Sequence, residues 1–145
     1  MRSYRREVVT HLSPREAWSY LADFTTTNEW DPRASHSTRV SGDGSVGTRY
    51  ETSVHFLGRT TQMTYTVTEL LPHDRIEWVG ENSVVRAHDV IEVRPHPQGA
   101  VVDYTSSYDY RVAAPLMDRL MSRPLERLCD DAQAGLGRAL DERAA

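Results

Sequence analysis

The chain has 145 residues and a formal net charge of -4; 26% of its residues are charged and 39% are hydrophobic. These values are ordinary for a soluble globular protein, so we expect one domain over residues 1–145 with a single hydrophobic core. The 17 basic residues are all arginine and are not gathered into a strip, which argues against a nucleic-acid partner.

The sequence carries no pattern typical of export or membrane insertion. Residues 1–12 lack the apolar h-region of a signal peptide, and no run approaches the ~18 apolar residues that a spanning helix needs. The one cysteine, Cys129, excludes an internal disulfide framework. The absence of lysine indicates coding bias in a G+C-rich genome. We therefore predict a bacterial, cytoplasmic protein without membrane insertion.

Two short helices are predicted after a first strand at residues 5–11. Ser13 is typical of a helix N-cap, and Glu16 is placed to close a capping box back onto Ser13. A second helix start follows at once, with Thr26 as the expected cap and Glu29 three residues on. This segment therefore predicts two helices in succession rather than one long helix.

Most of the chain after these helices is predicted to be strand. Asp31-Pro32 ends the second helix, because the residue before a proline is pushed out of the α region. Thr-, Val- and aromatic-rich runs separated by short turns then indicate an antiparallel meander. The six further strands are expected at residues 37–40, 48–57, 60–70, 75–79, 84–94 and 100–112.

Alternation with a period of two divides the side chains of these strands between two faces. The interior face is predicted to consist of Tyr50, Thr52, Val54, Phe56, Met63, Tyr65, Val67, Ile76, Trp78, Asp89, Ile91, Val93, Val102, Tyr104, Ser106, Tyr108 and Tyr110. A packed core seldom carries so many hydroxyls, since each one buried without a partner costs roughly 1–3 kcal/mol. The composition favours an aromatic-lined cavity for a small molecule. Alternatively, several tyrosines lie near strand ends and point their hydroxyls to solvent.

An amphipathic helix is predicted over residues 115–143, with apolar residues at three- and four-residue spacing. Its apolar stripe comprises Leu116, Leu120, Leu125, Leu128, Cys129, Ala132, Leu136 and Leu140. Pro124 is expected to kink this helix, or to divide it into a short lead and a longer body. We interpret Cys129 as a small core residue, because it has no neighbouring histidine or second cysteine.

A series of different short motifs lies along the chain: AW at residues 17–18, LADF at 21–24, WDP at 30–32, VGTRY at 46–50, FLGR at 56–59 and YTVTE at 65–69, followed by the closing helix over 132–140. In order and spacing they resemble the START-like superfamily, also called SRPBCC or Bet v 1-like, and specifically its bacterial polyketide cyclase/dehydrase branch. The resemblance covers essentially the whole chain. It implies an α+β helix-grip fold, in which a seven-stranded curved antiparallel sheet wraps around a long C-terminal helix. Two short helices after the first strand close one end.

The resemblance also implies a hydrophobic tunnel between sheet and helix, and members of the superfamily bind lipids, sterols, plant hormones or polyketides. We therefore expect an apolar, ring-containing ligand, lipid- or polyketide-like. The expected lining residues are Trp30, Tyr50, Thr52, Val54, Phe56, Met63, Tyr65, Trp78, Asp89, Ile91, Tyr104, Ser106, Tyr108, Leu120, Leu125 and Leu128. Trp30 is either a gate at the tunnel entrance or a packing plug between a short helix and the sheet.

Asp89 is the strongest candidate for a catalytic residue. If it faces the tunnel, desolvation raises its pKa and makes it a general acid or base. Hydroxyls such as those of Tyr65 and Tyr104 would polarise a carbonyl or stabilise an enolate, which suits aldol-type cyclisation followed by loss of water. Alternatively, Asp89 is paired with an arginine, or is turned outward by a one-residue slip in the register.

No motif indicates a metal or an organic cofactor. The six histidines are scattered without HxH or HxxxH spacing, and GxSxG, Walker and GxGxxG motifs are absent. We expect no cofactor, no metal, and a monomer or homodimer. The first functional hypothesis is a binding protein, and the second is an aromatic polyketide cyclase/dehydratase. A protein-interaction role is the third, and no basic patch supports it.

Overall fold

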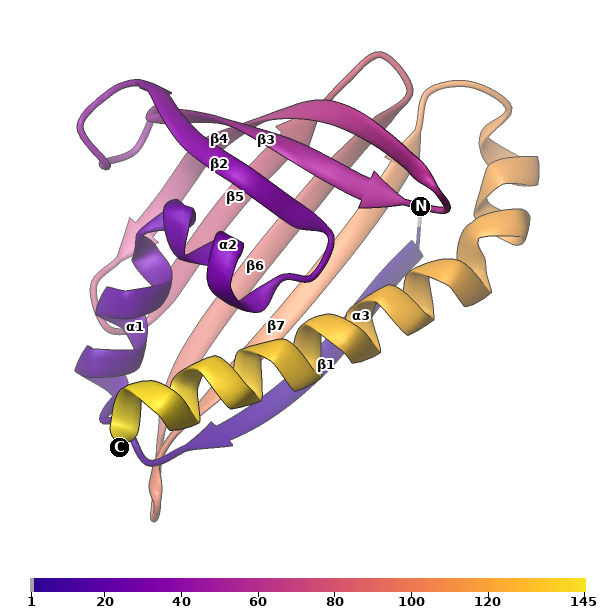
Figure 1. Cartoon of the computed structure of the whole chain (residues 1–145). Helices are drawn as coiled ribbons and strands as arrows, with labels where there is room; N and C mark the ends of the chain where they lie inside the picture. Colours follow the sequence, from indigo (N-terminus) through magenta and orange to yellow (C-terminus); the bar gives the residue numbers. More distant parts are fainter. Residues whose placement is uncertain (1) are drawn as a thin grey trace.

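Seven strands form one antiparallel sheet that is not closed and that curves around a long C-terminal helix (Figure 1). The computed structural model describes residues 2–145. The order across the sheet is β1-β7-β6-β5-β4-β3-β2. In chain order the elements are β1 (Arg2–Thr10), α1 (Pro14–Ala22), the 3₁₀ turn η1 (Phe24–Thr26), α2 (Thr27–Trp30), β2 (Ala34–Ser41), β3 (Arg49–Phe56), β4 (Arg59–Leu71), β5 (Arg75–Glu81), β6 (Val85–His96), β7 (Gly99–Tyr110) and α3 (Ala114–Ala144). The helix-grip fold predicted from the sequence is confirmed.

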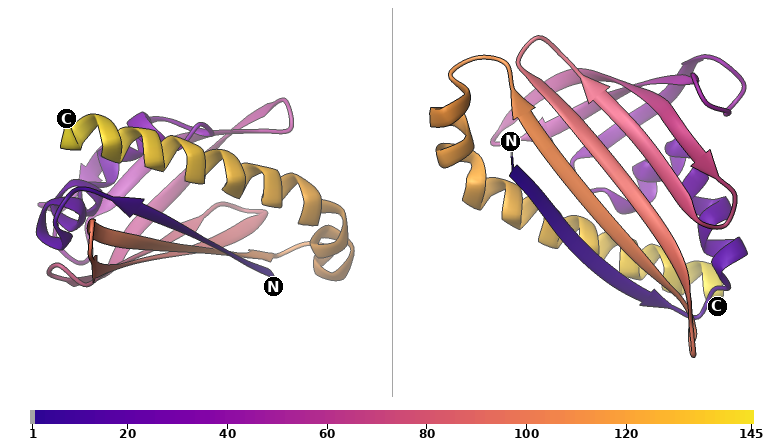
Figure 2. Two further views of the ribbon diagram at one scale, coloured as in Figure 1. Left: turned by 90° about the horizontal axis from the view of Figure 1, so that it is seen from below. Right: turned by 180° about the vertical axis from the view of Figure 1, so that it is seen from behind.

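The short helices close one end of the curled sheet, while α3 lies along its concave face (Figures 1 and 2). The capping box of α1 is present: the Glu16 amide donates to Ser13 Oγ and the Ser13 amide donates to Glu16 Oε1, each at 3.1 Å. The prediction for the second helix start is wrong in one detail. Thr26 makes no side-chain cap, because its hydroxyl donates to the Asp23 carbonyl at 2.8 Å. Asp23 instead caps the intervening 3₁₀ turn.

The strands are mostly longer than their sequence patterns indicate. β2 begins at Ala34 rather than at residue 37, and its pairing with β3 is irregular between Ser35 and Thr38. β6 continues through Pro95 to His96. The last strand is shorter than predicted and ends at Tyr110, because Ala113 adopts a left-handed conformation (φ 51°) and turns the chain into α3.

Helix α3 continues through Pro124, and its first turns are set at an angle to the long remainder (Figure 1). The long part comes very close to α2. An added Cβ at Gly135 would lie 2.1 Å from the Trp30 carbonyl oxygen, so only glycine fits at this crossing. Cys129 is buried on the inner stripe of α3, and burial raises the pKa of its thiol to about 11, which favours the uncharged core role expected for it.

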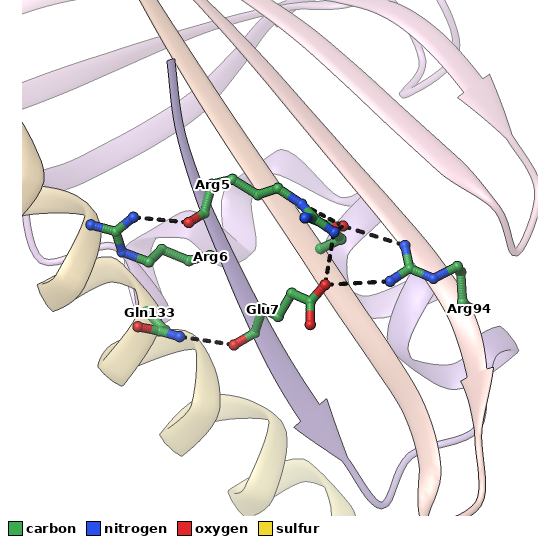
Figure 3. A network of polar contacts seen from close by, with 6 residues as sticks. Arg5, Arg6, Glu7, Arg94 and Gln133 are labelled. Carbon is green, nitrogen blue, oxygen red and sulfur yellow. Dashed lines mark hydrogen bonds and ion pairs between the residues drawn. The ribbon is translucent and has the colours of Figure 1, made fainter. Parts of the chain in front are cut away.

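An ion-pair network holds the outer face of the sheet together where β1, β7 and β6 meet (Figure 3). Arg5 Nε donates to the Asp103 carboxylate at 2.8 Å, and Arg94 Nη1 lies 3.3 Å from the same carboxylate. Arg94 also lies 3.5 Å from Glu7. On the other side of β1, Gln133 on α3 donates to the Glu7 carbonyl at 2.8 Å. The network therefore fastens the edge strand β1 to β7 and β6, and Gln133 adds a bond to α3.

Replacing Asp103 with asparagine is expected to lower the free energy of unfolding by about 1 kcal/mol at neutral pH. The hydrogen bond from Arg5 comes first among the causes that hold the pKa of Asp103 below its usual range. A depressed folded-state pKa contributes stability above the unfolded pKa of about 4 and loses it as pH falls through the folded value. Urea denaturation should therefore show the gap between wild type and Asp103→Asn closing as pH drops below about 4. The exposed Asp109, also on β7, is the matched control. An equal loss in Asp109→Asn would contradict the assignment.

Candidate ligand-binding site

An apolar groove of about 360 Å³ opens between the β3–β4 hairpin, the β5–β6 turn and the first half of α3. Its volume lies within the usual range for small-molecule sites. Most of its walls are aliphatic, methionine or aromatic side chains. The lining residues are Arg33, Val54, Phe56, Leu57, Arg59, Thr61, Met63, Asn82, Val84, Val85, Tyr108, Tyr110, Met117, Met121, Leu125 and Leu128.

Arg33 is a buried charged residue in the groove wall, and the sequence analysis did not single it out. It follows Asp31-Pro32 where α2 passes into β2, and it is only 8% exposed. Its Nε lies 3.2 Å from an Asp31 oxygen, and its Nη1 donates to the Tyr108 hydroxyl at 2.6 Å. Burial is the largest single effect and lowers the pKa of Arg33, but Asp31 and the neighbouring tyrosines together more than offset it and keep the pKa well above its usual value. The groove therefore contains a fixed, buried cation whose charge is balanced by a neighbouring carboxylate.

A second, much smaller cavity lies deeper between sheet and helices, and we call it the inner pocket. Its volume is about 10 Å³, enough for roughly one water-sized group. Its walls are Phe24, Thr27, Trp30, Asp31, Arg33, Ala34, Thr52, Val54, Tyr65, Trp78, Asp89 and Tyr104. Arg33 and Val54 line both cavities, so these two residues separate the groove from the inner pocket.

Asp89 lies on the inner face of β6 and is 3% exposed. The sheet register sets it between Trp78 on β5 and Ser106 on β7, and the Ser106 hydroxyl donates to Asp89 Oδ1 at 2.5 Å. Burial raises the pKa of Asp89, although Arg33 and the Ser106 hydrogen bond act in the opposite direction. The carboxyl therefore holds its proton more readily than a solvent-exposed aspartate does.

Tyr65 and Tyr104 bring two hydroxyls to the same inner pocket. Both side chains are buried. Burial, and after it the nearby Asp89, raises the pKa of each phenol well above its usual value. The ring of Tyr65 lies across Gly80 on β5, where an added Cβ would come within 2.5 Å of it. These tyrosines are therefore interior groups rather than solvent-facing strand ends.

The residues expected to bind ligand fall into three sets. Those lining the groove are Val54, Phe56, Met63, Tyr108, Leu125 and Leu128. Those lining the inner pocket are Trp30, Thr52, Val54, Tyr65, Trp78, Asp89 and Tyr104. Those lining neither cavity are Tyr50, Ile91, Ser106 and Leu120.

The four residues outside both cavities have different surroundings. Tyr50 packs against the ring of Phe24 at 5.0 Å, and Ile91 is fully buried in the core. Ser106 is also buried and reaches the inner pocket only through its bond to Asp89. Leu120 is 56% exposed, on the first part of α3. The predicted set therefore marks two separate cavities rather than one tunnel wall.

Trp30 packs between a short helix and the sheet, and it is not a gate at the entrance of the groove. It is 2% exposed, and its ring packs edge-on against Tyr104 with the centroids 5.7 Å apart. Its backbone lies against Gly135 of α3. The side chain thus wedges α2 between helix and sheet, and the groove opens at a different place.

A curved sheet gripping one long helix, with a cavity between them, defines the helix-grip class of proteins. The chain belongs to the family described as polyketide cyclase / dehydrase and lipid transport, whose model matches residues 1–141. No curated protein matches the sequence significantly. None of the helices within residues 2–145 has the length and hydrophobicity to cross a membrane. In the same part of the chain, no cluster of three or more histidine, cysteine or carboxylate side chains is arranged to hold a metal ion.

Solved structures confirm the fold at low sequence identity. The protein TTHA0849 from Thermus thermophilus is similar with a TM-score of 0.82 and 14% identity, over 99% of this chain and 100% of that one. The Zhui aromatase/cyclase from Streptomyces sp. R1128 also has a TM-score of 0.82, at 13% identity, over 99% of this chain and 96% of that one. Ara h 8.0201 is similar with a TM-score of 0.68 and 14% identity, over 96% of this chain and 97% of that one. At these identities the likeness concerns the fold and does not assign a ligand.

Proposed function

We propose that this protein binds an apolar, ring-containing small molecule, lipid- or polyketide-like, in the groove beside α3. The observation that carries the proposal is an open cavity of about 360 Å³ with apolar walls and one buried arginine. Such a composition favours burial of apolar surface, with a polar group to fix orientation. Family membership and the Bet v 1-like fold support the same class of ligand.

Filling the groove should weaken this binding. Met121 lines the groove from α3. Met121→Trp is therefore expected to lower the affinity for 1-anilinonaphthalene-8-sulfonate, a fluorescent anion with apolar rings, at least roughly tenfold by occupying the volume of the groove. Val40→Trp is the matched control, because Val40 is half exposed on β2 and lines neither cavity. Fluorescence titration of the folded proteins checks the result. Equal weakening in both variants would place the probe elsewhere.

The natural ligand can be sought without knowing its identity. Native mass spectrometry of protein purified from its own host should show an added mass that Met121→Trp lacks. Thermal-shift screens against lipids and aromatic polyketides should raise the melting temperature of the wild type only. A consistently unliganded protein with no shift across both libraries would contradict the binding function.

A second candidate function is an aromatic polyketide cyclase/dehydratase. It is favoured by the buried Asp89 with its raised pKa, which shares one pocket with the hydroxyls of Tyr65 and Tyr104. Asp89 would move a proton while a tyrosine hydroxyl stabilises the enolate oxygen. Likeness to the Zhui aromatase/cyclase supports the class. We rank it second because the inner pocket holds only about 10 Å³, too little for a reacting carbon chain.

For this second function, Asp89→Asn is expected to lower turnover of a poly-β-ketone substrate at least roughly 100-fold while probe binding in the groove is retained. The physical reason is that asparagine keeps the size and the bond to Ser106 but cannot carry the proton. Asp103→Asn, on the opposite face of the sheet, serves as control and should keep full turnover. Unchanged product formation in Asp89→Asn would remove Asp89 from the mechanism.

The cellular setting belongs to the proposal as well. We infer a bacterial cytoplasmic protein that acts as a monomer or homodimer without a nucleic-acid partner. The net charge of -4 supports the last point. Light scattering on the purified protein would decide between one copy and two.

A further inference from the structure

We propose that the protein docks on the surface of an anionic lipid bilayer with the end of the molecule at which the groove opens. The inference goes beyond the proposed ligand binding, because it names a partner surface rather than a ligand. It concerns docking at the interface and not a helix that crosses the membrane. Exposed apolar side chains near the groove mouth carry the argument. We call them the rim, and they are Leu57, Val84, Val112, Leu116 and Leu120.

The rim is contributed by the elements that border the groove. Leu57, in the β3–β4 turn, and Val84, in the β5–β6 turn, line the groove and are also exposed. Leu116 and Leu120 lie on the first turns of α3, each next in sequence to a methionine that lines the groove. These turns and the start of α3 lie together at the upper right of Figure 1. Exposed apolar side chains gathered around one opening mark an interaction site.

Leu57 stands at a position that neither the backbone nor the core favours. It forms a two-residue turn with Gly58, since Phe56 pairs directly with Arg59. Both turn residues have positive φ values, 52° and 74°, as a type I′ hairpin turn requires. Asparagine, aspartate and glycine suit such positions, whereas a leucine Cβ is crowded there. Because Leu57 is also 60% exposed, we assign its side chain a role outside the molecule.

The segments that carry the rim are basic, although the chain as a whole is acidic. The β3–β4 turn with its flanking residues (56–59), the β5–β6 turn (82–84) and residues 111–123 hold four of the 17 arginines but one of the 21 carboxylates. The neighbouring Glu81 is already paired with Arg111 at 2.8 Å. Anionic lipid headgroups complement this charge. A second copy of the chain does not, because two rims facing each other would repel.

On α3 the charge and the apolar surface share one face. Arg119 and Arg123 lie three or four residues from Leu116 and Leu120, so these four side chains are neighbours on the helix surface. All four are exposed. Asp118 is two residues from each leucine, so it lies off this face. Apolar side chains flanked by arginines are typical of a helix that rests in a lipid interface.

A bilayer suits this arrangement better than a protein partner does. The rim side chains project from separate turns and from a helix, around an opening rather than over a continuous flat surface. A fluid interface can accept each of them without a matching shape, and binding then scales with buried apolar area plus attraction to anionic lipid. Docking in this way also turns the groove mouth toward the lipid, so an apolar molecule could enter the groove without crossing water.

Co-sedimentation with vesicles tests the proposal. The wild type is expected to bind vesicles of phosphatidylcholine and phosphatidylglycerol in equal parts at least roughly tenfold more strongly than vesicles of phosphatidylcholine alone. Raising the salt to about 0.5 M should weaken this preference by screening. Equal binding to both vesicle types, or binding to neither, would overturn the proposal.

Leu57→Asn tests the apolar tip. Asparagine suits the left-handed turn, so the variant should be at least as stable as the wild type. It should nevertheless bind the mixed vesicles at least roughly fivefold more weakly, because an apolar side chain is lost from the interface. Leu71→Asn is the matched control, since Leu71 is exposed at the far end of β4, the strand that begins at Arg59. Equal weakening in the two variants would contradict the assignment of the rim.

The arginines are tested by Arg119→Gln/Arg123→Gln, which should lower binding to the mixed vesicles at least roughly tenfold and leave binding to phosphatidylcholine unchanged. Arg15→Gln/Arg138→Gln removes the same charge from exposed positions on α1 and on the second half of α3. This control should keep most of the binding. An equal loss in both double variants would show that net charge, and not this face, attracts the lipid.

Leu116→Gln/Leu120→Gln separates docking from ligand binding, because these leucines line neither cavity. The variant should lose vesicle binding but still bind 1-anilinonaphthalene-8-sulfonate in the absence of vesicles. A wild type that binds this probe but no vesicles would overturn docking and leave the proposed function in place. A wild-type dimer in light scattering that this variant abolishes, together with no vesicle binding, would assign the rim to a second copy and overturn the proposal.

Discussion

Arg33→Met is expected to lower the free energy of unfolding by about 3–5 kcal/mol, a loss typical of removing one partner from a buried ion pair. Arg33 and Asp31 are 8% and 7% exposed, and Asp31 accepts hydrogen bonds from both the side chain and the backbone amide of Arg33. Methionine replaces the aliphatic stem of arginine with an unbranched apolar chain but supplies no charge. The variant would leave the Asp31 carboxylate in the interior without its cation. The Tyr108 hydroxyl would also lose the hydrogen bond that Arg33 donates to it.

Urea denaturation of a small set of variants separates charge from packing. The double variant Asp31→Asn/Arg33→Met should recover part of the loss, because no uncompensated charge is then buried. Arg39→Met, on the exposed side of β2, should change stability by no more than about 0.5 kcal/mol. If Arg33→Met behaved like Arg39→Met, the ion pair would not contribute to the stability of the site.

Gly135→Ala is expected to destabilise the protein by about 2 kcal/mol, while Gly137→Ala, two residues on, is expected to leave it as stable or more so. An added Cβ at Gly135 would meet the Trp30 carbonyl oxygen at 2.1 Å, and backbone atoms cannot rotate out of the way. At Gly137 the nearest atom is the Val8 side chain at 3.8 Å, an ordinary contact. There alanine gains about 1 kcal/mol of helix propensity.

The Gly135 variant should also disturb the site, because α2 must move away from α3. Trp30 ends α2, and Asp31 and Arg33 follow it directly. We expect Gly135→Ala to weaken probe binding in the groove, whereas Gly137→Ala leaves it unchanged. Thermal unfolding and fluorescence titration of both variants give the comparison. Equal stability of the pair would show that the crossing of α2 and α3 tolerates a side chain.

The fold could be predicted from the sequence because its signals are local. The Ser13 capping box, the Asp31-Pro32 stop and the alternation of the strands each act over a few residues, and together they define the order of the elements. Thr26 shows the limit of such signals. The side chain fits the cap pattern, but Asp23 competes for the same turn and its carbonyl takes the Thr26 hydroxyl.

The site could be predicted only in part, because alternation assigns a face but not a depth. The alternation placed Tyr65, Asp89 and Tyr104 correctly in the interior. The division of the interior into an open groove and a small inner pocket, however, depends on how α2 packs. Arg33 was missed because it lies where an irregular strand begins, so period-two reasoning does not apply to it. The sequence did contain one indication of its role: Arg33 follows Asp31 by two residues, a spacing that allows a local ion pair.

The pairing of β1 with β7 has a consequence for how the protein forms. Arg2 pairs with Tyr108 and Thr10 with Ala100, so the first strand made on the ribosome finds its neighbour only after the rest of the sheet has been synthesised. Contacts between residues so distant in sequence slow folding, because a long loop must close before they are gained. The groove also needs α3, which follows β7. A nascent chain therefore has no groove until synthesis is nearly finished, and any molecule that bound there would assist only the last steps of folding.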